Sequence, residues 1–157
     1  MRVLLSVLVA VTSFLTVSSP ASAGSAHSAS ADLAYVEYQM YSVSISAFTD
    51  AANSTGDRWF DWSTDWCSAP LVGSTGRSFD FRASCRRHDF GYRNLRLLEF
   101  RYAGGGRYWN STSRLRVDQQ FLRDMKAHCR ARPWYEEATC RLWADSFYGA
   151  VRAAGGP

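Results

Sequence analysis

The sequence has few lysines and histidines and no second long apolar segment. Of its 18 basic residues only Lys126 is a lysine, and its three histidines are His27, His88 and His128. The net charge of +4 is small and follows no basic stripe, which argues against a nucleic-acid-binding protein. No apolar run beyond the first residues could cross a bilayer. The absence of a G-x-S-x-G sequence argues against a serine nucleophile on a strand-to-helix turn.

The first 23 residues have the pattern of a secretory signal peptide. Arg2 precedes a charge-free, largely apolar run from Val3 to Val17, and Ala21-Ser22-Ala23 forms an A-x-A cleavage site. The alternative is a transmembrane anchor, for which the run is too short and lacks a basic stop-transfer patch. Cleavage after Ala23 would remove only one charge, that of Arg2, and leave 134 residues with a net charge of +3. We therefore expect one secreted (extracellular) domain.

An even number of cysteines follows the signal segment, which in a secreted chain predicts two disulfides. Three connectivities are possible for four cysteines. The sequential one, Cys67 with Cys85 and Cys129 with Cys140, closes two short loops and is favoured here. Each bridge would stabilise the fold by about 2–4 kcal/mol, mainly by restricting the unfolded chain.

Helical periodicity is the main signal of secondary structure, whereas the strand pattern is weak and no internal repeat occurs. Residues 24–31 are small and polar, so we expect a linker or short pro-segment with His27 exposed to solvent. Residues 32–157 would then form the functional domain. An apolar period of helical spacing predicts a first helix over Asp32–Ala52, and residues 61–82 are rich in turn residues and predict a loop. The apolar positions of that helix are Leu33, Val36, Met40, Val43 and Ala47.

Three more helices are expected, and the first two should form an antiparallel pair joined by a glycine turn. One begins near Ala83-Ser84, the next covers Arg114–Cys129 with Ser113 as its N-cap, and the last covers Glu136–Val151. The buried candidates of the last helix are Leu142, Trp143, Phe147 and Tyr148. The expected fold class is mostly α, a small helical domain stapled by two disulfides.

A histidine and an aspartate occupy inward positions on the antiparallel pair. Cys85, His88 and Tyr92 share one face of the first helix, and Asp118 falls inside an apolar stripe of the second, with no basic residue apparent on that stripe. A buried carboxylate needs a partner, and His88 could supply it. An aspartate that holds one imidazole nitrogen leaves the other free as a general base. The alternative is a buried polar pair with a structural role only.

Asp89 follows His88 and points about 100° further round the helix, toward an adjacent site. Calcium prefers carboxylate and carbonyl oxygens, which the loop Phe60–Cys67 also offers. A Cys67–Cys85 bridge would tie this loop to the His88 helix. The other interpretation of Asp65, within the loop, is a turn or cap residue.

Three blocks together resemble the secreted phospholipase A2 family, most closely its bacterial and fungal (Streptomyces-type) branch. They are FDWSTDWC (Phe60–Cys67), CRRHDFGYRN (Cys85–Asn94) and RLRVDQQFLRDMKAHC (Arg114–Cys129). The resemblance implies a calcium-dependent enzyme that hydrolyses the sn-2 ester of glycerophospholipids. The glycine-rich calcium loop and doubled cysteine of the animal enzymes are absent, so no animal-specific residue is carried over.

The resemblance also implies roles for individual residues. His88 would be the general base and Asp118 would orient it. Asp65 and Asp89 would bind calcium through their carboxylates, and Trp66 through its backbone carbonyl. In the family the residue at the position of Trp66 is commonly leucine, so the bulk of the indole bears on how an acyl chain fits.

The expected partner is a phospholipid membrane or micelle surface. We expect the protein to be a monomer and not to bind nucleic acid. Trp134-Tyr135 and Tyr108-Trp109 could anchor the protein in lipid, or could pack in the core. Three rival functions stay open: a zinc site made by Cys85, His88, His128 and Cys129; a calcium-dependent lipid-binding protein without turnover; and a metal-dependent nuclease. Export argues against zinc, since the thiols would oxidise.

Overall fold

The computed structural model describes residues 27–54, 56–67, 79–154 and 156. Within them the chain forms five α-helices and one π-helical turn: α1 (Ala29–Glu37), η1 (Tyr38–Ser42), α2 (Ile45–Asn53), α3 (Arg82–Arg101), α4 (Ser111–Arg130) and α5 (Trp134–Ala154). The expected mostly-α, disulfide-stapled fold class is confirmed. No helix in these ranges combines the length and apolarity needed to cross a bilayer. The expected signal peptide, residues 1–23, lies outside the described residues.

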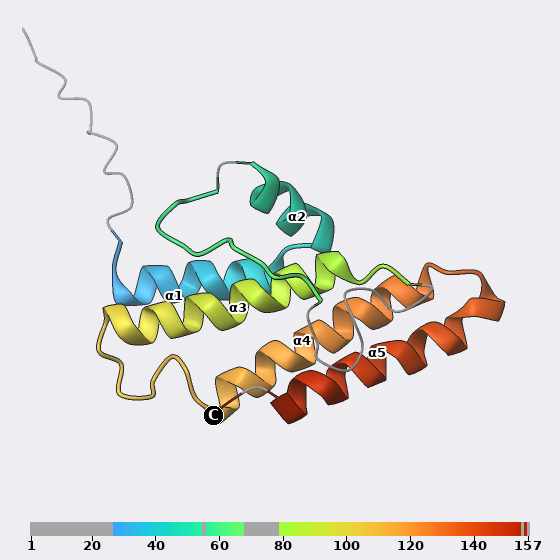
Figure 1. Cartoon of the computed structure of the whole chain (residues 1–157). Helices are drawn as coiled ribbons and strands as arrows, with labels where there is room; N and C mark the ends of the chain where they lie inside the picture. Colours follow the sequence, from blue (N-terminus) through green and yellow to red (C-terminus); the bar gives the residue numbers. More distant parts are fainter. Residues whose placement is uncertain (1–26, 55, 68–78, 155, 157) are drawn as a thin grey trace, which may run out of the picture.

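Helices α3 and α4 run antiparallel, and α4 packs against α5 on its other side, while α1 lies along α3 (Figure 1). The turn between α3 and α4 uses Gly105 and Gly106, whose φ angles of 61° and 89° favour glycine. Glu99, near the end of α3, accepts hydrogen bonds from the backbone N–H groups of Gly106 at 2.6 Å and Tyr108 at 2.8 Å. This turn therefore fixes how the two long helices face each other.

The N-terminal region differs from the expected linker followed by one long helix. Helix α1 begins at Ala29, inside the segment expected to be a linker, because the Ser28 hydroxyl accepts a hydrogen bond from the N–H of Ala31 as an N-cap. The helix then loosens into η1 and stops at Val43, which is extended (φ −86°, ψ 154°). Ser44 caps a separate helix, α2. The serine N-cap and the β-branched residues beside it therefore divide the segment into two helices, although its apolar period is continuous.

His27 is exposed, as expected, and it also has specific partners. Its Nδ1 lies 2.8 Å from a carboxylate oxygen of Asp32, and its ring stacks on Trp59 with a centroid distance of 4.4 Å. Asp32 is buried and also accepts hydrogen bonds from Trp59 and Tyr102. This cluster fastens the start of α1 to the end of α3.

Helix α4 begins three residues earlier than expected. Asn110, not Ser113, is the N-cap: its side-chain oxygen accepts hydrogen bonds from the N–H groups of Thr112 at 2.9 Å and Ser113 at 3.0 Å. Ser113 instead accepts from the N–H of Asn110, which completes a capping box. Both residues are good caps, so the sequence alone could not decide between them.

Both disulfides form with the expected sequential pairing, Cys67–Cys85 and Cys129–Cys140. The first ties the loop before α3 to the first turn of α3, and the second ties the end of α4 to α5. No described cysteine is free. Paired cysteines cannot ligate zinc as thiolates, so the zinc interpretation is wrong.

For helix α5, one of the four expected buried residues is wrong, and the other three are buried or partly buried. Phe147 is buried and Trp143 and Tyr148 are partly buried, but Leu142 is 68% exposed. The register is set by Cys140, whose disulfide to α4 turns Cys140, Ala144 and Phe147 inward and Leu142 outward. A disulfide partner can rotate a helix in a way that its own apolar period does not reveal.

Close packing of α3 against η1 and α4 depends on Gly91. A Cβ atom at this position would lie 2.8 Å from Met40 Sδ and 2.9 Å from Val117 Cγ1. We expect Gly91→Ala to lower the free energy of unfolding by about 1–3 kcal/mol, the usual cost of overpacking. Urea denaturation followed by circular dichroism measures this change.

Gly149 in α5 is the matched control for Gly91. A Cβ atom there meets nothing within 4 Å, so Gly149→Ala should leave stability unchanged or raise it by about 0.5–1 kcal/mol. Equal effects of the two substitutions would contradict this account of the packing.

Candidate active site

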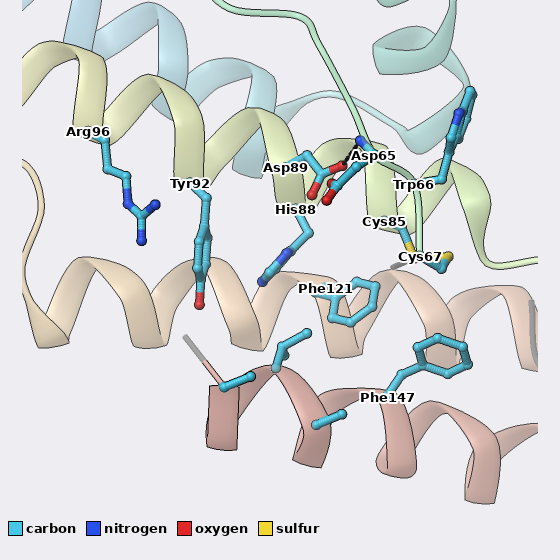
Figure 2. A pocket seen from close by; sticks show the side chains of 13 residues that line it. Asp65, Trp66, Cys67, Cys85, His88, Asp89, Tyr92, Arg96, Phe121 and Phe147 are labelled. Carbon is cyan, nitrogen blue, oxygen red and sulfur yellow. Dashed lines mark hydrogen bonds between the residues drawn. A yellow bond between two sulfur atoms is a disulfide. The ribbon is translucent and has the colours of Figure 1, made fainter. Parts of the chain in front are cut away.

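A cavity of about 280 Å³ opens between the loop before α3 and helices α3, α4 and α5 (Figure 2). One side is polar and carries His88, Asp89 and Asp65. The opposite wall is apolar and comes from Phe121 of α4 and from Phe147, Ala150, Val151 and Ala154 of α5. The cavity can therefore hold a molecule with a polar end and a hydrocarbon chain.

His88 and Asp118 meet across the antiparallel pair. Nε2 of His88 lies 2.7 Å from Oδ1 of Asp118, and Asp118 is fully buried. A carboxylate can only accept a hydrogen bond, so Nε2 carries the hydrogen and the lone pair of the ring is on Nδ1. The phenyl ring of Phe121 packs against the imidazole at a centroid distance of 4.8 Å. This geometry can present Nδ1 as a base in the cavity.

Asp118 has more partners than the sequence suggested. The expectation of no basic residue on its stripe is wrong, because Arg114, one turn earlier on α4, places Nε 3.6 Å from Oδ2. Arg152 of α5 donates from Nη1 to the same oxygen at 2.7 Å. The Tyr92 hydroxyl donates to Oδ1 at 2.7 Å. Asp118 therefore joins α3, α4 and α5.

These partners keep Asp118 ionised. Burial alone would raise the pKa of Asp118, but hydrogen bonds from His88, Arg152 and Tyr92 together outweigh burial and hold this pKa below its ordinary value. Burial, with a smaller contribution from the Asp118 carboxylate, raises the pKa of Tyr92 to about 12. Tyr92 therefore keeps its proton and serves as a donor.

The loop before α3 is fastened to that helix by Asn94. The side-chain amide of this fully buried residue donates to the carbonyl of Asp61 at 2.7 Å and accepts from the N–H of Asp61 at 2.8 Å. The indole of Trp62 packs on Phe90 with a centroid distance of 4.5 Å. These contacts, none of which we predicted, hold the next residues of the loop over His88 and Asp89.

Loop and helix bring two carboxylates together. Thr64 donates from its hydroxyl to Oδ2 of Asp89 at 2.5 Å, and the N–H of Asp65 lies 3.2 Å from the same oxygen. Figure 2 shows the carboxylates of Asp65 and Asp89 side by side. Burial raises the pKa of Asp89 to about 6, and the negative charge of Asp65 adds to this effect. The two carboxylates therefore repel each other when both are ionised, unless a cation lies between them.

The donor set at this place suits a hard cation. It offers two carboxylates and the backbone of Trp66, which has a positive φ of 60°, a conformation that costs energy for a non-glycine residue. Arg93 lies 3.5 Å from one oxygen of Asp65 and offsets part of the charge. No three His, Cys, Asp or Glu side chains among the described residues gather into a metal site on their own. A cation here would therefore need carbonyl oxygens as well, as calcium accepts.

The structure thus places His88 beside Asp118, and Asp65, Trp66 and Asp89 beside one another at the same cavity.

The two aromatic pairs considered as lipid anchors differ in their exposure. Tyr108 is buried, and Trp109 packs on Tyr92, so these rings belong to the core. Trp134 and Tyr135, at the start of α5, are exposed.

Comparison with known proteins shows the family to which the chain belongs. The family model described as "Prokaryotic phospholipase A2" matches residues 36–155. A protein of Arthroderma benhamiae named "Secretory phospholipase A2" is 34% identical over 119 residues, which cover 74% of each chain. A protein of the same name from Beauveria bassiana is 32% identical over 117 residues, 74% of this chain and 55% of that one. The chain belongs to the prokaryotic phospholipase A2 family.

Proposed function

We propose that the protein hydrolyses the sn-2 ester of glycerophospholipids in a calcium-dependent reaction and releases a fatty acid and a lysophospholipid. One observation carries this proposal: a buried His88–Asp118 pair opens onto the same cavity as the paired carboxylates Asp65 and Asp89, opposite an apolar wall. Family membership and the names of the fungal relatives support phospholipid hydrolysis.

In the proposed reaction His88 activates a water molecule. Nδ1 takes a proton from the water while the water oxygen attacks the ester carbonyl carbon. Asp118 stabilises the imidazolium that results and keeps the ring in one orientation. The imidazolium then returns the proton to the alcohol oxygen as the C–O bond breaks. Water is thus added across the ester, and no acyl-enzyme forms.

The residues that would hold calcium are Asp65, Asp89 and the carbonyl of Trp66. Calcium bound there supplies positive charge for the substrate phosphate and for the oxyanion that develops on the carbonyl oxygen. Thr64 and Asn94 keep the loop and Asp89 in place for this purpose.

The substrate would enter with its acyl chain along the apolar wall made by Phe121, Phe147 and Val151. Trp66 lines the same cavity and is 45% exposed, so its indole would contact the bound lipid. Exposed Trp134 and Tyr135 favour a membrane–water boundary and would add contacts to a lipid surface. We also propose that the mature chain acts outside the cell as a monomer.

The products test this proposal. We expect phosphatidylcholine micelles and calcium to yield free fatty acid and lysophosphatidylcholine in equal amounts, with no acylated protein during turnover. An acyl-enzyme would raise the mass of the protein by that of one acyl group, so an acylated protein found by mass spectrometry after a rapid acid quench would contradict direct attack by water.

A lipid-binding protein without turnover is the second candidate. It would bind the micelles in the presence of calcium and release no fatty acid. The intact His88–Asp118 pair favours the enzyme, since lipid binding alone does not need a base with a fixed tautomer.

A further inference from the structure

Arg152, in the last turn of α5, makes a direct contact with Asp118. Its Nη1 donates to Oδ2 of Asp118 at 2.7 Å, a charge-assisted hydrogen bond of the short and strong kind. Arg152 lies 34 residues after Asp118 and does not line the cavity. We propose that Arg152 is a positioning residue, which holds the carboxylate of Asp118 in the one orientation that aligns His88. This proposal rests on the hydrolytic function proposed above.

The two oxygens of Asp118 have separate partners. Oδ1 takes hydrogen bonds from His88 and Tyr92, and Oδ2 takes one from Arg152. The terminal torsion of an aspartate is broad, so a carboxylate held at one oxygen only can turn about its axis. The bond from Arg152 stops this rotation. Because His88 is hydrogen-bonded to Oδ1, the orientation of its imidazole ring depends on the plane of the Asp118 carboxylate, which Arg152 fixes.

Arg152 is itself held in place by a second arginine. Buried Arg114 donates from Nη2 to the backbone carbonyls of Val151 at 3.0 Å and Arg152 at 2.8 Å. Carbonyls in the last turn of a helix have no partner within the helix, so these bonds satisfy them and fasten α5 to α4. Nε of Arg114 also donates to the Tyr92 hydroxyl at 3.1 Å. One network thus joins the end of α5 to Arg114, Tyr92 and Asp118.

The end of α5 therefore has two roles in one structure. Ala150, Val151 and Ala154 form part of the apolar wall, and Arg152, between them in sequence, turns toward Asp118. Because Asp118 is fully buried, the loss of Arg152 would leave its Oδ2 with Arg114 alone, at 3.6 Å. The carboxylate would turn toward that cation or admit water through the space left by a side chain that is one-third exposed. Either change moves the imidazole.

The test compares Arg152→Met and Arg152→Lys with Arg141→Met. Arg141 is the matched control, since it is an exposed arginine of the same helix whose partner among the described residues is the half-buried Glu137. The substrate is a short-chain phosphatidylcholine in monomeric solution, which removes any effect of charge on binding to a lipid surface. We expect kcat to fall about tenfold to hundredfold in Arg152→Met with KM unchanged, because misplacing a reactive group by about 1 Å costs up to about 10². Arg152→Lys should recover part of the loss, and Arg141→Met should match the wild type.

A second measurement does not depend on turnover. The ¹⁵N–¹H resonance of the His88 Nε2–H group, identified by its absence in His88→Gln, reports the hydrogen bond to Asp118. We expect this resonance in the wild type and in Arg141→Met, and its broadening or loss in Arg152→Met. If Arg152→Met does not fold, Arg152→Lys decides by the same two readouts.

The outcomes separate this inference from the proposed function. An unchanged kcat in folded Arg152→Met, or a loss shared with Arg141→Met, would overturn the positioning role while hydrolysis by the wild type stands. If the wild type does not hydrolyse the lipid, the proposed function fails, and the resonance alone decides whether Arg152 orients the pair.

Discussion

The variant His88→Ala should lose about 10³-fold in kcat, within the 10²–10⁴ that a general base contributes. We expect no other described group to replace its Nδ1 at the cavity. Asp118 is buried behind the ring and Tyr92 keeps its proton, while Asp65 and Asp89 would be engaged as calcium ligands. Calcium binding should be unchanged, since the proposed ligands belong to Asp65, Trp66 and Asp89. Turnover of phosphatidylcholine and calorimetric titration with calcium measure the two quantities.

His27→Gln is the matched control for His88→Ala. His27 also contacts an aspartate, Asp32, but it does not line the cavity. Glutamine can still donate to that carboxylate, so activity should equal that of the wild type. Turnover in His88→Ala within a few-fold of the wild type would show that His88 is not the base.

The variant Asp89→Asn should act on calcium and not on the base. Asparagine still accepts the hydrogen bond from Thr64 but removes one of two negative charges at the proposed site. We expect the calcium concentration for half-maximal activity to rise at least about tenfold, in line with the dependence of calcium affinity on ligand charge. At saturating calcium a large part of kcat should return. Calorimetry should show the same loss of affinity without substrate.

Asp61→Asn is the control for Asp89→Asn. Asp61 belongs to the same loop, but its carboxylate accepts hydrogen bonds from Ser63 and does not line the cavity. Its substitution removes the same charge and should leave calcium affinity close to that of the wild type. Equal effects of the two substitutions would mean that overall charge, not ligation, controls the response.

The sequence predicted the parts of the fold that depend on local signals. The helical period located α3, α4 and α5 within a few residues, and the glycine turn predicted the antiparallel pair. Short loop closure predicted both disulfides. The split between α1 and α2 was missed because a continuous apolar period does not register the competing cap at Ser44.

The apolar period of one helix does not predict its contacts with elements that are distant in the sequence. His88 and Asp118 could be matched because both fall on inward faces of neighbouring helices. Arg114 was overlooked although it lies four residues before Asp118, on the same face, and this spacing could have revealed it. Arg152 could not be found in the same way, since the rotation of α5 against α4 depends on the disulfide at Cys140 and on side-chain packing.

The most direct test of the central claim uses a phosphatidylcholine with a different labelled acyl chain at each position, with calcium and with a chelator. The claim is that a histidine base and a calcium site share one cavity. It predicts release of the sn-2 chain with calcium and no release after chelation. Equal release in both conditions would contradict the calcium site, and release of the sn-1 chain alone would contradict the proposed placement of the ester.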